Sequence, residues 1–219
     1  MLSKRLSMIF SLIQPCGIFA DIGSDHGYLA LEVLKSGRAK YVIATDIRTG
    51  PLKHAQKTFA QANVFENVSY VLSDGIRSIT ESIDCVVISG LGADVILNII
   101  QQDLERFKTI PQIIVQANTK LSALRIGLAQ LGFQIREEKI VCDGFYYLAQ
   151  KIVYAGLYAE ISEDEAHYGK LIDSQDPVYR AYLQSELTKI SAILKQYPHS
   201  EKHKIQIALL KTRLDERVD

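Results

Sequence analysis

Short apolar runs alternate with helical patterns along the first two thirds of the chain. Five runs rich in β-branched residues predict buried strands, at residues 18–22, 41–46, 68–72, 84–89 and 112–116. Between and after these runs, the spacing of apolar residues predicts helices at 28–36, 51–62 and 121–131. Gly37 and Gly132 follow the helices at 28–36 and 121–131, and Pro51 suits the first turn of the helix at 51–62. The alternation predicts an α/β fold whose mostly parallel sheet is covered on both faces.

Two further patterns frame this core. Two longer predicted strands, at residues 133–141 and 146–155, flank Asp143-Gly144, which predicts a hairpin that adds an antiparallel edge. At the start of the chain, Lys4 and Arg5 precede an apolar stretch that superficially resembles a signal peptide. We expect an amphipathic helix there instead, because one helical face collects Leu2, Leu6, Ile9, Phe10 and Ile13.

The pattern becomes purely helical beyond Gly156. Ser162 and Glu165 have the spacing of a capping box, and two long apolar periodicities meet near Pro198. They predict a coiled-coil-like hairpin of two antiparallel helices. We therefore predict an α/β domain over residues 1–157 and a helical hairpin over residues 158–219.

Composition narrows the function classes only slightly. The 219 residues are 47% hydrophobic and carry 25 basic and 25 acidic side chains, so no basic arm for nucleic acid is evident. Three cysteines form no C-x-x-C pair and the five histidines are scattered, which predicts no metal site and reduced thiols in a cytoplasmic protein. No apolar run is long enough to predict a membrane span.

Polar side chains mark the ends of four predicted strands. Asp21, Asp46, Asp74 and Ser89 each close one of them. Ligands of parallel sheets bind outside the carboxyl ends of the strands, so these residues predict a common binding site. An aspartate at a strand end also serves as a helix cap or turn residue, so each one alone is weak evidence.

A glycine turn follows the first of these aspartates, in the sequence Asp21-Ile-Gly-Ser-Asp-His-Gly-Tyr-Leu29. Its spacing does not match the dinucleotide fingerprint G-x-G-x-x-G, and a P-loop is absent. S-adenosylmethionine fits better, because it combines an amino acid, a ribose and an adenine without phosphate. We expect Asp21 and the turn to hold the methionine end, Asp46 the ribose hydroxyls and Asp74 the adenine amino group. The predicted cofactor residues are Asp21, Ile22, Gly23, Ser24, His26, Gly27, Asp46, Ile47, Ser73, Asp74, Gly75, Ser89, Gly90 and Leu91.

Together these motifs resemble the bacterial tRNA (adenine(22)-N1)-methyltransferases. The resemblance rests on the turn with its Asp25-His26 pair, on Thr45-Asp46-Ile47, Ser73-Asp74-Gly75 and Ile88-Ser-Gly-Leu-Gly92, and on Gln116-Ala-Asn118. It covers essentially the whole chain and implies a Rossmann-like class I methyltransferase sheet. It also implies S-adenosylmethionine as cofactor, S-adenosylhomocysteine as product, and an adenine in the D-arm of tRNA as substrate. One departure is Gly90-Leu91-Gly92-Ala93, where the family leads us to expect Gly-Met-Gly-Gly.

Roles for further residues remain open at this stage. Asp25, His26 and Tyr28 are the catalytic candidates: Asp25 to stabilise charge on the alkylated base, His26 or Tyr28 to stack on it. Alternatively, Asp25 caps the following helix and His26 shapes the cofactor loop. Phosphate contacts are expected from Arg5, Lys120 and Arg125.

Three hypotheses about function follow. The leading one is a tRNA methyltransferase acting on N1 of adenine 22. The second is a methyltransferase for small molecules on the same cofactor domain. The third is a cofactor-binding interaction module in which the helical hairpin binds a protein and no methyl group is transferred. Independently of these hypotheses, the hairpin is a candidate for tRNA binding, for binding a protein partner or for a weak homodimer.

Overall fold

The computed structural model describes residues 2–215 and comprises seven strands and nine helices within them. Residues 1 and 216–219, at the outer ends of the two predicted domains, lie outside the described part. The strands are β1 (Cys16–Ile22), β2 (Ala39–Asp46), β3 (Val68–Leu72), β4 (Cys85–Gly92), β5 (Gln112–Thr119), β6 (Phe133–Asp143) and β7 (Phe145–Tyr154). The helices are α1 (Lys4–Leu12), α2 (Tyr28–Lys35), α3 (Thr49–Gln61), α4 (Ala93–Gln102), α5 (Leu104–Phe107), α6 (Leu121–Gln130), α7 (Glu163–Tyr168), α8 (Pro177–Gln196) and α9 (Glu201–Asp215).

All seven strands form one sheet in the order β3-β2-β1-β4-β5-β7-β6. The five strands from β3 to β5 run parallel, whereas β7 pairs antiparallel with both β5 and β6. The chain crosses from β3 to β4 over the sheet centre, so the strand order reverses beside β1. Ligands of open α/β sheets bind at such a reversal, and the functional groups described below lie there.

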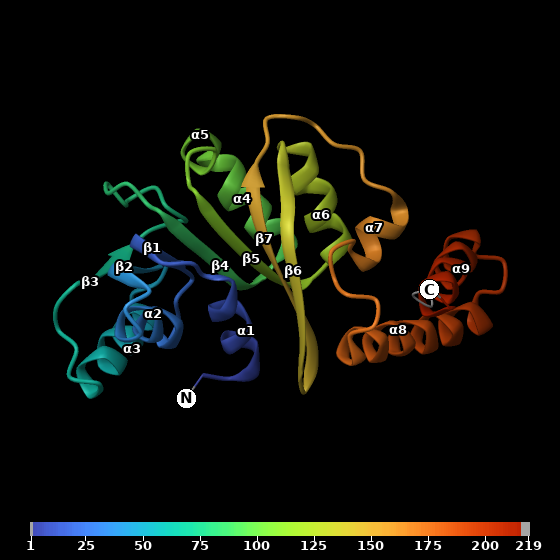
Figure 1. Ribbon diagram of the computed structural model, residues 1–219, viewed down its shortest axis with the longest axis horizontal. Helices are drawn as coiled ribbons and strands as arrows, with labels where there is room; N and C mark the ends of the chain where they lie inside the picture. Colours follow the sequence, from blue (N-terminus) through green and yellow to red (C-terminus); the bar gives the residue numbers. More distant parts are fainter. Residues whose placement is uncertain (1, 216–219) are drawn as a thin grey trace.

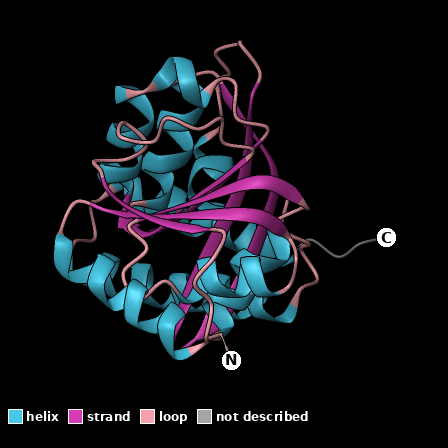
Figure 2. Ribbon diagram, turned by 90° about the vertical axis from the view of Figure 1, so that its left-hand side faces the viewer, coloured by secondary structure: helices cyan, strands magenta, loops and turns pink. Residues whose placement is uncertain are grey.

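Helices cover both faces of this sheet (Figures 1 and 2). On one face, α1, α2 and α3 bury residues such as Leu12, Val33 and Phe59 against β1 and β2. On the other face, α4 and α6 bury residues such as Ile96 and Leu128. Burial on both faces explains why the central strands are continuous apolar runs rather than alternating ones.

The C-terminal helices pack at the β6–β7 side of the molecule (Figure 1). The capping box that starts α7 is present: the Ser162 hydroxyl accepts from the Glu165 amide, and the Glu165 carboxylate accepts from the Ser162 amide. Helices α8 and α9 form a pair around Leu183 and Leu210, and this small core includes Leu148 of β7. The helical segment is thus tied to the sheet by apolar contacts.

These features confirm the predicted fold class. The doubly covered sheet, the antiparallel β6–β7 hairpin around Gly144 and the C-terminal helix pair are all present. Strand β4 extends three residues beyond the predicted Ser89 through an irregular register. Helices α4 and α5 occupy the stretch between the fourth and fifth predicted strands, where no helix bounds were predicted. The division at residue 157 stays a prediction. Among the described residues, no helix has both the length and the apolar character to cross a membrane.

Candidate functional site

A cleft of about 770 Å³ opens at the carboxyl ends of β1, β2 and β4. Asp21 of β1, Asp46 of β2 and residues 89–91 of β4 line it. The register places Asp21 beside Ala44 of β2 and Val87 of β4, so these strand ends are neighbours across the reversal. Other predicted site residues in the lining are Arg5, Gly23, Ser24, Asp25, His26 and Tyr28.

The remaining predicted cofactor residues lie outside this lining. Ser73 donates its amide to the Asp46 carbonyl at 3.0 Å, so residues 73–75 follow directly beside Asp46. Asp74 is half exposed and lies 4.0 Å from Arg77. At Gly75, with φ +67°, an added Cβ would lie 2.9 Å from the Ile99 side chain. Packing against α4 therefore accounts for glycine at this position.

Asp21 is a buried carboxyl group, only 4% exposed. It accepts from the Ser24 hydroxyl at 3.0 Å. Burial raises the pKa of Asp21 to about 6, while the hydrogen bonds from Ser24 and the Ala30 amide and the charge of Arg5 act in the opposite direction. A buried carboxyl group with an elevated pKa is suited to bind a cationic group, which would favour its ionised form.

The turn after Asp21 holds its shape largely through its own amides. The amides of Gly23 and Ser24 both donate to the Thr45 carbonyl at 2.9 Å, and the Gly27 amide donates to the Ser24 carbonyl at 2.8 Å. These three amides are therefore not available to a ligand, so they cannot hold the methionine end as expected of the turn. Within the described residues, the amides of Asp25 and His26 make no hydrogen bond.

Asp25 does not cap helix α2. The N-cap of α2 is Gly27, and no side chain bonds to the first turn. Asp25 itself adopts φ +46°, an unfavourable left-handed conformation for a residue with a Cβ, and its carboxylate lies 3.6 Å from His26 Nε2. The capping alternative is therefore wrong, and the exposed Asp25 carboxylate is held at the mouth of the cleft.

Asp46 offers one carboxylate oxygen to the cleft. Its Oδ1 accepts from the Arg48 amide at 2.9 Å, whereas its Oδ2 makes no hydrogen bond among the described residues. The side chain is 9% exposed. A half-satisfied carboxylate in a polar cleft can accept a hydroxyl donor from a ligand.

The floor of the cleft is a bulge at Gly90, where the pairing of β4 with β5 shifts register. Gly90 has φ +79°. Because the regular pairing is interrupted there, side chains of β5 bond to the Gly90 backbone. Its amide donates to Gln116 Oε1 at 3.2 Å, and its carbonyl accepts from Asn118 Nδ2 at 2.8 Å. Gln116 Oε1 also accepts from Arg5 Nη1 at 3.1 Å. This network fixes both the floor and the guanidinium of Arg5.

Three aromatic rings stack beside the glycine turn. His26 lies between Tyr28 and His54, with centroid distances of 5.5 and 5.1 Å. Sequence reasoning missed His54, which reaches the turn from α3 and has no distinguishing spacing. Asp25, His26 and His54 also bring potential metal ligands within 4.8 Å of one another. However, the imidazole planes are nearly parallel at 8°, so their in-plane lone pairs do not converge on one ion.

The three predicted phosphate contacts differ in their surroundings. Arg5 lies in the cleft. Lys120 is exposed at the start of α6 and pairs with Asp94 at 2.6 Å. Arg125 is buried, bonds to Glu138 at 3.0 Å and donates to the Ala166 carbonyl. The prediction for Arg125 is therefore wrong: this side chain is a structural tie between α6, β6 and α7.

Comparison with known proteins places this cleft in a family. The model of a family described as "Methyltransferase domain" matches residues 2–149. The chain belongs to the methyltransferase domain family. This family segment contains the first six strands, the first half of β7 and every cleft residue described above.

Particular methyltransferases resemble the chain over nearly its whole length. The tRNA (adenine(22)-N(1))-methyltransferase of Bacillus subtilis is 26% identical over 203 residues, which is 92% of this chain and 82% of the relative. The structure of M. capricolum TrmK with S-adenosylhomocysteine matches with a TM-score of 0.84 and 28% identity, over 98% of each chain. A Streptococcus pneumoniae protein in complex with S-adenosyl-L-methionine matches with a TM-score of 0.88 and 27% identity, over 98% of this chain and 100% of the other. The resemblance inferred from the motifs is thus confirmed.

Proposed function

We propose that this methyltransferase transfers the methyl group of S-adenosylmethionine to N1 of adenine 22 in the D-arm of tRNA. The observation that carries the proposal is the likeness to tRNA (adenine(22)-N1)-methyltransferases, which extends beyond the methyltransferase domain into the C-terminal helices. A small-molecule methyltransferase on the same domain would not require those helices to match. The coverage therefore favours the RNA substrate.

The residues of the cleft fit the cofactor. Asp46 Oδ2 is available to the ribose hydroxyls, and the buried Asp21 is suited to the ammonium of the methionine part, directly or through water. The Ser73 amide donates to the Asp46 carbonyl, so Asp74 lies next to the strand end that carries Asp46 and is the candidate for the adenine amino group. When bound, the cofactor supplies an electrophilic methyl group.

The reaction needs positioning more than proton transfer. Adenine N1 carries a lone pair and no proton, so no general base is required. The bulge at Gly90, fixed by Gln116 and Asn118, provides a rigid floor that aligns the reacting atoms. Asp25 is the candidate for stabilising the positive charge that develops on the base, and His26 and Tyr28 are candidates for stacking on it. Because N1 lies on the pairing edge, the target base must leave its pair.

The C-terminal helices are the part of the chain that we expect to bind the tRNA away from the cleft. We assign residues 158–219 to tRNA binding and residues 1–157 to methyl transfer. A weak homodimer and a cytoplasmic location stay predictions.

Methyl transfer from labelled cofactor tests the proposal against both alternatives. The protein is incubated with unmodified tRNA transcripts or with a pool of small metabolites. We expect label in tRNA only. Label in metabolites and none in tRNA would support the small-molecule enzyme, and tight cofactor binding without any transfer would support the interaction module.

A further inference from the structure

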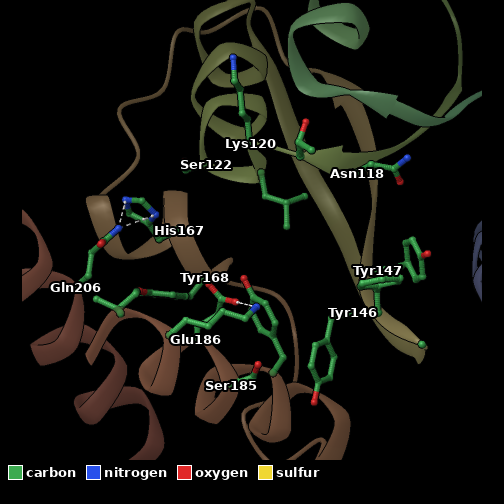
Figure 3. A pocket seen from close by; sticks show the side chains of 17 residues that line it. Asn118, Lys120, Ser122, Tyr146, Tyr147, His167, Tyr168, Ser185, Glu186 and Gln206 are labelled. Atoms are coloured by element: carbon green, nitrogen blue, oxygen red, sulfur yellow. Dashed lines mark hydrogen bonds and ion pairs between the residues drawn. The ribbon is translucent and has the colours of Figure 1, made fainter. Parts of the chain in front are cut away.

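A second cavity, of about 750 Å³, lies between the β6–β7 hairpin, the start of α6 and the C-terminal helices. We call it the hairpin groove. Figure 3 shows Tyr146 and Tyr147 on one side of it and His167 with Gln206 on the other. The cofactor contacts proposed above do not involve this second cavity.

The hairpin groove joins the cofactor cleft. Asn118 and Tyr147 line both cavities. The Arg5 guanidinium lies 5.6 Å from the centroid of the Tyr147 ring, so a cation and an aromatic face stand at the junction. A polynucleotide whose target base enters the cleft has to continue along the surface, and this junction leads directly into the hairpin groove.

One wall of the hairpin groove is aromatic. Tyr146 of β7 and Tyr182 of α8 lie edge to face, with centroids 5.6 Å apart. Tyrosine rings provide apolar faces for a nucleobase, and such stacking accepts any base. Glu186 in the same wall pairs with Lys189 at 2.7 Å, so its negative charge is neutralised locally.

The opposite end of the hairpin groove is the start of helix α6. Its N-cap, Lys120, has φ +58° and provides no side-chain cap, and Leu121 and Ser122 also line the cavity. The first amides of a helix have no intrahelical acceptor and favour an anion such as phosphate. The ten-residue α6 therefore presents phosphate-binding chemistry to the same cavity as the tyrosines.

A buried hydroxyl supports a polar occupant. Tyr168 lines the hairpin groove and is 2% exposed, and its hydroxyl has no hydrogen-bond partner among the described residues. Burial raises the pKa of Tyr168, so this group stays a protonated donor. An unpaired buried hydroxyl is unfavourable, and a polar ligand or an accompanying water would relieve it once a small shift of the Tyr168 ring opens the hydroxyl to the groove.

Building on the proposed function, we propose that the hairpin groove binds one unpaired nucleotide of the tRNA, next to the target adenine. Its base stacks on Tyr146 and its phosphate lies at the start of α6. The site anchors the strand after the target base has entered the cleft. It therefore contributes to the affinity for tRNA and not to the binding of the cofactor.

A charge substitution at the start of α6 tests the phosphate contact. Ser122→Glu places a carboxylate where the phosphate is expected, yet acidic residues are favourable in a first helical turn, so folding is preserved. We expect KM for tRNA transcript to rise by about tenfold, with kcat and cofactor affinity unchanged. The matched control is Gln130→Glu, which adds the same charge at the other end of α6, about 12 Å away along the helix axis. We expect it to change KM by less than about twofold.

A substitution in the aromatic wall tests the stacking contact. Tyr146→Ala should raise KM for tRNA by about tenfold, whereas Tyr146→Phe keeps the ring and should stay within about twofold of the unmodified protein. Thermal unfolding of both variants checks that the edge-to-face contact with Tyr182 is not required for folding.

Two results would overturn the inference. One is a KM for tRNA that is no higher in Ser122→Glu than in Gln130→Glu, and no higher in Tyr146→Ala than in Tyr146→Phe. The other is a loss confined to kcat or cofactor affinity. Both experiments require that the unmodified protein methylates tRNA. If it does not, the proposed function itself fails, so the two failures are distinguishable.

Discussion

Two carboxyl groups on adjacent strands face the same cleft, and their hydrogen bonds give them different properties. Asp21 accepts from Ser24 and is buried with an elevated pKa, whereas Asp46 keeps one oxygen free among the described residues. Asp21 is therefore suited to bind a cation, and Asp46 is suited to accept hydrogen bonds from hydroxyl groups. Each can be tested by an isosteric amide.

Asp46→Asn removes the charge but keeps the shape of the side chain. We expect the affinity for S-adenosylmethionine to fall by about 1.5–3 kcal/mol, because hydrogen bonds to a charged acceptor are lost. Calorimetric titration measures this. The exposed Glu66→Gln serves as a control that removes one negative charge away from the cleft. Equal affinities for the two variants would exclude Asp46 from cofactor binding.

Asp21 makes stability depend on pH in an unusual direction. Its pKa is about 6 in the folded protein, against an ordinary aspartate value of 3.8, so the folded state binds more protons between these values. The contribution of Asp21 to folding therefore falls as pH rises from 4 to 6, by up to about 3 kcal/mol. We expect Asp21→Asn to be more stable than the ligand-free parent at pH 7 and not at pH 4. Urea unfolding at both pH values measures the difference, and a pH-independent difference would contradict the assignment.

Arg125 shows how a charged residue on an amphipathic helix can be misassigned. Burial by itself would raise the pKa of Glu138, but Arg125 and hydrogen bonds hold it below its usual value. Arg125→Met leaves this carboxylate without its ion pair, so we expect the free energy of unfolding to fall by about 3–5 kcal/mol. The more exposed Arg136→Met should change it by less than about 0.5 kcal/mol. Urea unfolding of both variants checks this, and similar losses would refute the structural role.

At the scale of elements, the bulge in β4 requires glycine at position 90 for two reasons, its positive φ and the close approach of the Arg5 side chain. Alanine there would have to adopt φ +79°, and its Cβ would lie 3.0 Å from Arg5 Nη1. We expect Gly90→Ala to lower kcat/KM for tRNA by about tenfold, or about 1.4 kcal/mol in the barrier. Gly37→Ala is the matched control, because Gly37 has φ +73° and an added Cβ there meets nothing within 4 Å. If both variants lose activity equally, general strain and not the Arg5 contact is responsible.

The sequence predicted the elements better than the contacts between them. Strands β1, β2 and β4 follow from their β-branched runs, and strand ends in a parallel sheet must meet at one edge, so Asp21 and Asp46 could be placed together. Nothing in the sequence shows that the amides of Gly23 and Ser24 bond to Thr45, because that depends on how β1 and β2 pair. Helix α5 was missed because four residues give no measurable periodicity.

At the scale of the whole molecule, the arrangement links two cavities through β5. Asn118 lies at the end of this strand, holds the floor of the cofactor cleft and lines the hairpin groove. The methyltransferase domain and the C-terminal helices thus meet around a single continuous surface. A substrate that spans both, as we propose for tRNA, uses the whole chain.

The most direct test of the proposed activity is the position of the transferred methyl group. A tRNA transcript with adenine at position 22 is methylated with labelled S-adenosylmethionine, and the modified nucleoside is identified and mapped. We predict 1-methyladenosine at position 22 and no label in a transcript with guanine at that position. Label on a cytosine, on an exocyclic amine or at another adenine would contradict the proposal.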